Sequence, residues 1–377
     1  MKNTVYYLGA GASIQAIPTI DGLRDRIKDL SQFIESYITT DVYSPLLQKL
    51  DSRIREHQNT LRVIKDDLEF LYTESEIHQT VDTLARKFSL KGDHESLKRL
   101  KRGLVSYFFF EQCVGFEGKN TKYQLLIDKR YDNLIASIAE NDVNGIKLRD
   151  DIKIITWNYD LQVEHTIQNY TNEKINVIKN KYQIHPNQKS LNEAKNKIID
   201  PNRFSMFKLN GNAFMDRVFQ NEGSNGVTPH DININPNTQR SDSAKIGDYL
   251  VEFEELFPEG KLTGADVFKY FNFAWEKDEK YPGFDNMITN ILDVIKNTER
   301  LIIVGYSFPF FNAEIDRKIL SACRPREIII QDLYPETIKD RLLELIPDYG
   351  AVPDKIKPPI KFTLQLPGNY FPISAAV

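Results

Sequence analysis

The chain has 377 residues, which is enough for one large domain or two modest ones. Charged residues make up 27% and the net charge is −4, so the composition is that of an ordinary globular protein without a basic field for nucleic acid or anionic membranes. Its two cysteines, Cys113 and Cys323, can form neither a disulfide framework nor a four-cysteine zinc site, and no apolar run is long enough to cross a bilayer.

The first predicted element is a short apolar strand over residues 5–8, which runs directly into Gly9-Ala10-Gly11-Ala12-Ser13. A buried strand followed by a glycine-rich turn is how a doubly wound α/β sheet begins. The glycines would let backbone N–H groups approach a phosphate, and the hydroxyl of Ser13 would add a donor. Because a single G-x-G is weak evidence, a tight strand-to-helix turn without a ligand is the alternative.

A long block of helical periodicity follows, which we assign to residues 24–148. Apolar residues recur at helical spacing within it, for example at Leu61, Ile64, Leu68 and Leu71. The block is too long for a single crossover helix. We therefore expect a helical insertion or second lobe whose apolar stripes form its core.

Three later segments are typical of parallel strands that are buried on both faces. Residues 152–156, 301–304 and 327–330 are short β-branched runs, and polar or small residues follow each of them. In open α/β sheets the ligand lies at the carboxyl ends of the strands. We predict an α/β fold with a Rossmann-like, doubly wound parallel sheet, a large helical insertion, and a site formed by the residues that follow these strands.

The predicted sheet domain comprises residues 1–23 and 149–345, with surface excursions at about 169–203 and 213–298. We expect residues 346–377 to form an extended, proline-containing C-terminal arm that lies on the fold or on a neighbouring chain.

Two segments have a local excess of positive charge. Residues 169–203 carry seven Lys/Arg against three Asp/Glu, and residues 86–102 are similarly basic. A run of charge is more often a solvated face than a nucleic-acid patch. We therefore do not expect direct binding of nucleic acid.

Four motifs in a fixed order resemble the sirtuin-like superfamily, and its bacterial antiphage branch more closely than the protein deacetylases. They are Gly9-Ala10-Gly11-Ala12-Ser13 with Ile17-Pro18-Thr19, then Thr156-Trp157-Asn158-Tyr159-Asp160, Lys208-Leu209-Asn210-Gly211-Asn212 and Gly305-Tyr306-Ser307-Phe308-Pro309. The second and fourth match the family pattern fully, whereas Ala16 replaces a glycine near the first. The resemblance covers the sheet motifs and not the helical block.

The resemblance implies an NAD+ hydrolase that releases nicotinamide, leaves ADP-ribose, and acts in antiphage defence by depleting NAD. Asn158 would hold the water or ribose hydroxyl at the nicotinamide-bearing carbon, and Asp160 would orient Asn158 or the nicotinamide amide. The other implied contacts are Gly9, Ala10, Gly11 and Ser13 at the pyrophosphate, Thr19 on the nicotinamide side, Gly305 and Ser307 at phosphate or the adenosine ribose, and Asp332 at the adenosine ribose hydroxyls. For Asp332, a helix N-cap before Tyr334-Pro335 is an equal alternative.

Asn210 stands where the family has its catalytic histidine. A histidine there would accept a proton from a ribose hydroxyl near neutral pH, whereas an amide can only hydrogen-bond that hydroxyl. Loss of a general base lowers a rate roughly 10²- to 10⁴-fold. Either Asn210 is a deliberate, inactivating replacement, or it is natural and Asn158 with water carries a slower reaction. The alternative function is a catalytically silent NAD or ADP-ribose-binding sensor or scaffold.

The resemblance also bears on metals, partners and location. A zinc-dependent deacetylase is disfavoured, because two cysteines cannot form the zinc ribbon of that class, and we expect no metal. Since no sensor domain is evident, we expect a homo-oligomer that works with a separate partner, either a HerA-type hexameric ATPase or another sensor protein. We expect a cytoplasmic protein without a membrane partner, because no signal-peptide core precedes the glycines.

Overall fold

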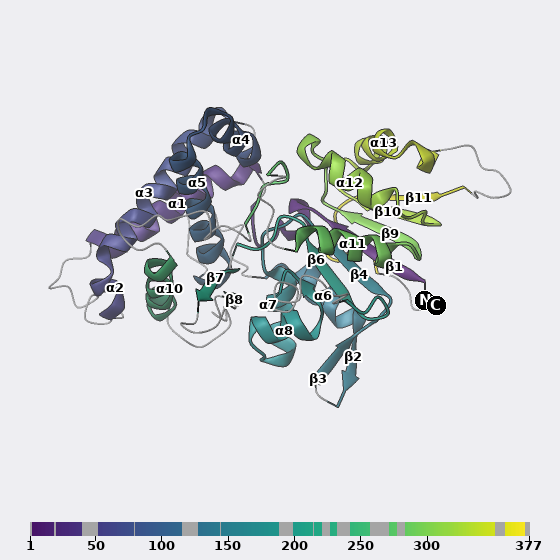
Figure 1. Ribbon diagram of the computed structural model, residues 1–377, viewed down its shortest axis with the longest axis horizontal. Coiled ribbons are helices and arrows are strands. Elements are labelled where there is room, and N and C mark those ends of the chain that lie inside the picture. The colour runs from purple at the N-terminus through teal and green to yellow at the C-terminus, as the bar shows by residue number, and fades with distance from the viewer. Residues whose placement is uncertain are drawn as a thin grey trace.

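The computed structural model has an α/β fold, in which a parallel sheet flanked by helices lies beside a mostly helical region (Figure 1). This confirms the predicted fold class. The residues that the structure describes are 2–18, 20–39, 52–78, 80–114, 127–143, 145–187, 199–213, 215–220, 227–231, 242–256, 271–276, 283–350 and 359–373.

Within these residues the main sheet has seven parallel strands in the order β11-β10-β9-β1-β4-β6-β5. The strands are β1 (Asn3–Leu8), β4 (Ile152–Thr156), β5 (Ile184–His185), β6 (Ser205–Lys208), β9 (Thr298–Val304), β10 (Glu327–Gln331) and β11 (Lys361–Gln365). From the central β1 the chain builds β4, β5 and β6 on one side and then returns to pair β9 on the other. The switch point of this doubly wound sheet therefore lies between β1 and β9.

Helices cover both faces of the sheet, and the alternation of side chains along β1 decides which face each residue joins. Tyr6 and Leu8 pack on one side, and Val5 and Tyr7 on the other. The first face is covered by α6 (Lys129–Ile138), α7 (Gln162–Thr171) and α8 (Ile175–Lys181), and the second by α11 (Phe284–Ile295), α12 (Ala313–Leu320) and α13 (Pro335–Leu345).

A third core lies in the helical region, on the left of Figure 1. It is formed by α1 (Ile20–Thr39), α2 (Ser52–Glu56), α3 (Gln58–Glu74), α4 (Val81–Lys91), α5 (His94–Phe109) with the π-helical turn Phe110–Val114, α10 (Asp242–Leu256) and residues 271–276. None of the described helices combines the length and the apolar composition that crossing a bilayer requires.

Local sequence explains where α4 ends and α5 begins. The hydroxyl of Thr80 accepts the N–H of Thr83 at the start of α4, at 3.1 Å. The helix ends at Gly92, whose φ of +68° suits glycine better than any other residue. Asp93 then caps α5 by accepting the N–H of Ser96 at 3.1 Å. The two helices can thus follow one another with only two residues between them.

The helical region does not coincide with the predicted insertion at residues 24–148. α6 packs on the sheet, and the hairpin of β2 (Ala139–Asp142) and β3 (Gly145–Leu148) follows it there. Conversely, α10 and residues 271–276 come from the predicted excursion at 213–298 and complete the helical core. Amphipathic periodicity shows that a helix buries one face, but it does not show against which partner. The same excursion contains a second hairpin, β7 (Met215–Gln220) with β8 (Val227–Asp231).

The described residues of the predicted C-terminal arm, 346–350 and 359–373, include regular structure. A short 3₁₀ turn spans Pro347–Gly350, and β11 adds a parallel edge strand beside β10. Further on, the side chain of Phe371 is fully buried in the core under α6. Lys361–Gln365 and Phe371 of this arm therefore pack with the sheet.

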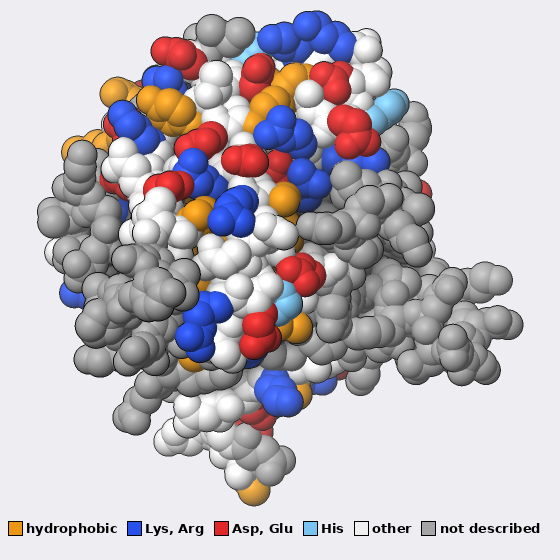
Figure 2. Space-filling view, turned by 90° about the vertical axis from the view of Figure 1, so that its left-hand side faces the viewer, with side chains coloured by type: hydrophobic (Ala, Val, Ile, Leu, Met, Phe, Trp, Pro, Cys, Tyr) orange, Lys and Arg blue, Asp and Glu red, His pale blue; other side chains and the backbone are white. Residues whose placement is uncertain are grey.

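The basic segment 86–102 has partners for its charges. Arg99 and Arg102 both bind Asp67, and Lys101 binds Glu276 at 2.7 Å. Figure 2 shows lysine and arginine side chains interspersed with acidic ones over the face of the helical region that it presents. That face carries no surface of a single sign among the described residues.

Tyr249 ties α10 to the helical core, which gives a test of this assignment. Its ring stacks on Phe109 with centroids 3.8 Å apart, its hydroxyl lies 3.0 Å from Ser106 Oγ, and it is fully buried. We expect Tyr249→Ala to lower the free energy of unfolding by about 3–5 kcal/mol. Urea denaturation measures this change. The exposed Leu90→Ala is the control and should change it by less than about 0.5 kcal/mol; equal effects would contradict the assignment.

Candidate functional site

The carboxyl ends of four neighbouring strands bring most of the predicted site residues to one edge of the sheet. The loop Gly9–Ser13 follows β1, Asn158 and Asp160 follow β4, Asn210 follows β6, and Gly305 follows β9. Residues Ala10–Ser13 form a short 3₁₀ helix. The parallel sheet itself therefore aligns segments that are far apart in the sequence.

The glycines allow two loops to touch at the switch point. Gly11 donates its N–H to the carbonyl of Gly305 at 3.0 Å. A Cβ on Gly305 would lie 2.4 Å from Gly11 backbone atoms, and one on Gly9 would lie 2.6 Å from the carbonyl oxygen of Gly305. Gly305 also has a φ of +56°, which disfavours a side chain. Loop contact thus requires these glycines whether or not a phosphate binds there.

Ser13 connects the glycine loop to the segment that follows β4. Its hydroxyl donates to Asp160 Oδ2 at 2.7 Å, and Asn158 Nδ2 lies 3.3 Å from the same Oγ. Asn158 Nδ2 also donates to the carbonyl of Gly9 at 3.0 Å. The link that we expected between Asp160 and Asn158 therefore runs through Ser13. All three side chains are at most 9% exposed.

Asp160 is a buried carboxyl with a cation beside it. Burial raises its pKa, while the charge of Lys208 and the hydrogen bond from Ser13 oppose that rise. Lys208, at the end of β6, donates to the main-chain oxygen of Asp160 and to Glu164 Oε1, the latter at 3.0 Å. Lys208 and Glu164 are completely buried. This ion pair fixes the start of α7 against β6.

Asn210 contacts the backbone of the neighbouring strand end. Its Nδ2 donates to the carbonyl of Trp157 at 3.1 Å, and its main-chain oxygen accepts the N–H of Asn272 at 3.1 Å. The Oδ1 of Asn210 is buried, and no residue that the structure describes donates to it. Among the described residues, Asn210 Oδ1 is thus an acceptor without a partner, and its amide nitrogen contacts the segment that contains Asn158.

The remaining predicted residues lie elsewhere on this edge. Ala10 and Ser307 are exposed, and the carbonyl of Ser307 accepts from Arg341 Nη1 at 2.8 Å. Asp332 Oδ1 accepts the N–H of Tyr334 at 3.0 Å, so it forms a turn before α13 although Tyr334 is the N-cap residue. Thr19 lies outside the described residues.

Sequence reasoning missed Asp316, a buried carboxylate on α12 that receives three aromatic donors. Tyr7 OH and Trp157 Nε1 donate to its Oδ1 at 2.5 Å and 2.9 Å, and Tyr306 OH donates to its Oδ2 at 2.6 Å. Because Trp157 precedes Asn158 and Tyr306 follows Gly305, this carboxylate holds both loops in place. The sequence does offer one sign of this role. Asp316 lies one helical turn before Ile319, so an acidic residue occupies the apolar face of α12.

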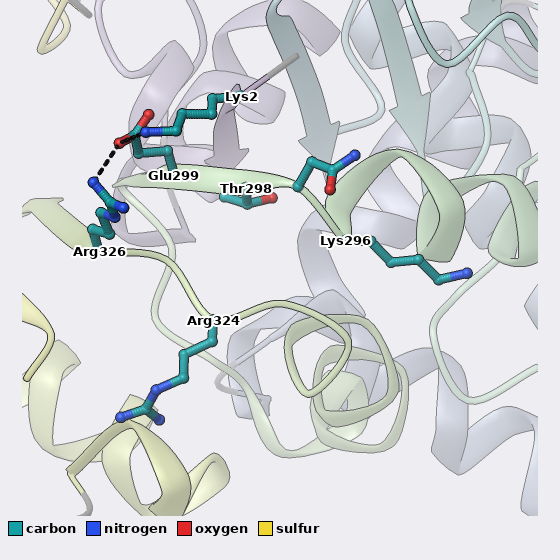
Figure 3. A pocket seen from close by; sticks show the side chains of 7 residues that line it. Lys2, Lys296, Thr298, Glu299, Arg324 and Arg326 are labelled. Carbon is teal, nitrogen blue, oxygen red and sulfur yellow. Dashed lines mark hydrogen bonds and ion pairs between the residues drawn. The ribbon is translucent and has the colours of Figure 1, made fainter. Parts of the chain in front are cut away.

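Two hollows lie at opposite edges of the sheet. One of about 530 Å³ is at the carboxyl ends of β10 and β11, and Gln331, Gln365 and Tyr370 are among its lining residues. The other, of about 380 Å³, is at the amino ends of β1 and β9 (Figure 3). In this second hollow Glu299 pairs with Lys2 and Arg326. Because it lies at the amino ends of the strands, it is separate from the candidate site at their carboxyl ends.

No known family model matches this chain, and no curated protein does either. The likeness to the sirtuin-like superfamily thus rests on the four motifs. Among the described residues, no group of three or more His, Cys, Asp or Glu side chains is arranged to hold a metal ion.

The contact between the loops predicts a large effect of a single methyl group. Gly305→Ala combines an unfavourable φ, about 1–2 kcal/mol, with overpacking, about 1–3 kcal/mol, so we expect the free energy of unfolding to fall by about 2–5 kcal/mol. Denaturant unfolding measures it. Gly92→Ala is a matched control, because its φ is +68° but no neighbour lies within 4 Å of the added Cβ. Equal losses in both variants would mean that the loops do not touch.

The buried Asp316 predicts a pH-dependent stability. Burial raises its pKa to about 7 despite the hydrogen bonds that oppose this. Between about pH 4 and pH 7 the folded chain then retains a proton that the unfolded chain has lost, so the contribution of Asp316 to stability falls as pH rises, by up to about 1.4 kcal/mol per unit. We expect Asp316→Asn to remove this slope in urea unfolding. The exposed Asp340→Asn should leave it unchanged; an identical slope in all three chains would refute the prediction.

Proposed function

We propose that the chain binds NAD+ at the carboxyl edge of the sheet and hydrolyses its nicotinamide–ribose bond. The observation that carries this proposal is the group of Asn158, Ser13 and Asp160, which lies beside the switch point between β1 and β9. Doubly wound sheets bind dinucleotides at such a point. The hollow at the ends of β10 and β11 gives room on the same edge for the adenosine half.

The chemistry suits a site with amide and carboxylate groups. Nicotinamide leaves as a neutral molecule with the electron pair of the broken C1′–N bond, so its departure needs no acid. The ribose becomes oxocarbenium-like, and the negative charge of Asp160 would stabilise it. Asn158 Nδ2 is engaged by the carbonyl of Gly9, so Oδ1 is the atom that would accept from a water or a ribose hydroxyl. The water oxygen bonds to C1′, and its proton passes to solvent.

The rate of hydrolysis that we expect depends on the side chain at position 210. A histidine at this position could donate from one ring nitrogen to the carbonyl of Trp157, as Asn210 Nδ2 does, and keep the other nitrogen as a base. The present amide provides an acceptor but cannot take up a proton. We therefore propose slow hydrolysis by this chain.

A second candidate is a silent NAD or ADP-ribose-binding sensor or scaffold, and the same Asn210 favours it. On either proposal the resemblance suggests a role in antiphage defence, in an assembly with further copies of the chain and a HerA-type ATPase or another sensor. NAD depletion would be the effector step only if the chain turns NAD+ over.

Nicotinamide release from NAD+ tests the proposal. We expect slow release by the chain, a rise of about 10²- to 10⁴-fold in Asn210→His, and loss of release in Asn158→Ala. Chromatographic detection of nicotinamide, beside calorimetric binding of ADP-ribose, separates turnover from binding. The exposed Asn141→Ala is the control and should behave like the unchanged chain.

The outcomes discriminate between the two functions. ADP-ribose binding without release in any variant, alone or with a partner ATPase, would favour the sensor. Absence of both binding and release would reject both functions.

A further inference from the structure

One arginine holds the carbonyl side of the glycine loop. Arg130, on α6, donates from Nη2 to the carbonyl oxygens of Gly11 and Ala12, each at 3.0 Å. The same guanidinium binds Asp128 at 2.6 Å, and both side chains are at most 2% exposed. Because a guanidinium is planar and Asp128 fixes its orientation, Arg130 determines the direction in which these two peptide groups point.

Asp128 also binds the residues that follow the glycine loop. Its Oδ2 accepts the N–H of Gln15 at 3.0 Å, just beyond Ser13. Its own N–H donates to Gln162 Oε1 at 2.7 Å, at the start of α7. The glycine loop is thus joined through Asp128 to the helix that follows Asp160.

An aromatic ring from the C-terminal arm supports the arginine. The Cζ of Arg130 lies 5.1 Å from the ring centre of Phe371, a cation–π arrangement. The same ring meets Tyr131 edge-on at 5.0 Å, and the hydroxyl of Tyr131 lies 3.2 Å from Ser13 Oγ. Phe371 therefore contacts both side chains through which α6 reaches the loop.

Hydrogen bonds from side chains to the backbone around Phe371 place its ring against α6. Three side chains donate to main-chain oxygens of its segment: Asn133 to Asn369 at 3.2 Å, Gln331 to Tyr370 at 3.1 Å, and Tyr6 to Pro372 at 2.8 Å. The side chain of Tyr370 itself is 61% exposed. The segment is thus held by hydrogen bonds to its backbone and by the buried side chains of Phe371 and Pro372.

We propose that Phe371 is a positioning residue for the glycine loop, acting through Arg130 and Tyr131, and that the segment Asn369–Pro372 thereby regulates nucleotide binding. With the segment docked, the loop keeps the shape in which Ser13 meets Asp160. When the segment is displaced, Arg130 loses its support and the loop loosens. The nucleotide part of this inference rests on the proposed function, whereas the coupling of segment and loop does not.

The test uses the full chain and three variants. Phe371→Leu keeps an apolar side chain but removes the ring face, and Arg130→Lys keeps the charge but removes the planar fork. Asn369→Ala is the control in the same segment, because this side chain is exposed and only its main-chain oxygen takes part in the contact with Asn133. Hydrogen exchange of the amides in residues 9–17, without nucleotide, reports the state of the loop. Calorimetry with ADP-ribose, which the chain does not consume, reports the site.

We expect exchange in residues 9–17 to become at least about tenfold faster in Phe371→Leu and Arg130→Lys, while β4 and β10 keep their protection. Asn369→Ala should behave like the unchanged chain. ADP-ribose affinity should fall by about tenfold in the first two variants. Unchanged loop exchange in both, or equally faster exchange throughout the sheet, would overturn the proposal. If the unchanged chain binds no ADP-ribose, the proposed function fails and regulation of binding fails with it, while loop exchange still decides the coupling.

Discussion

A contact between two backbones organises this molecule. Where β1 and β9 end, Gly11 donates its N–H to the carbonyl of Gly305, and the loops are so close that neither residue has room for a side chain. The carbonyl of Gly9 in the same loop accepts from Asn158, which places the amide of the candidate site. On the other side, Tyr306 follows Gly305 and reaches the buried carboxylate on α12. The position of Asn158 in the candidate site and the contact of Tyr306 with Asp316 therefore both depend on the close contact between these two loops.

The segment after β4 joins two of the three cores of the protein. Trp157 turns into the core under α12, whereas Tyr159 stacks on Phe271 in the helical region, with ring centroids 4.4 Å apart. Asn158 and Asp160 turn instead toward the glycine loop. Since successive residues of an extended segment point in different directions, one short stretch can carry polar groups while its aromatic neighbours are locked by packing.

The sequence predicts the sheet well because strands buried on both faces are rich in apolar residues. Residues 301–304 are all apolar, and residues 152–156 are apolar apart from Lys153 and Thr156. It also predicts that polar residues follow those strands. It does not predict that Ser13 would donate to Asp160, because that bond depends on how two loops turn after their strands end. The role of Arg130 could not be predicted, because Arg130 belongs to no sequence motif and meets the glycine loop only when α6 packs against the sheet. The helical region has other bounds than the predicted insertion at residues 24–148 for the same reason: periodicity does not identify the element against which a helix packs.

The position of β1 also has a consequence for how the chain acquires its structure. Tyr6 pairs with Ile154 on one side and with Ile302 on the other, so the central strand finds its neighbours only after about 150 and about 300 intervening residues. Local contacts in the helical hairpins can form earlier, whereas the sheet requires closure of two very long loops. During synthesis this apolar strand therefore has no partner until β4 has been made, and its second partner, β9, follows much later. The hydrogen bond from Gly11 to Gly305 can form only after β9 and the residues that follow it have been made.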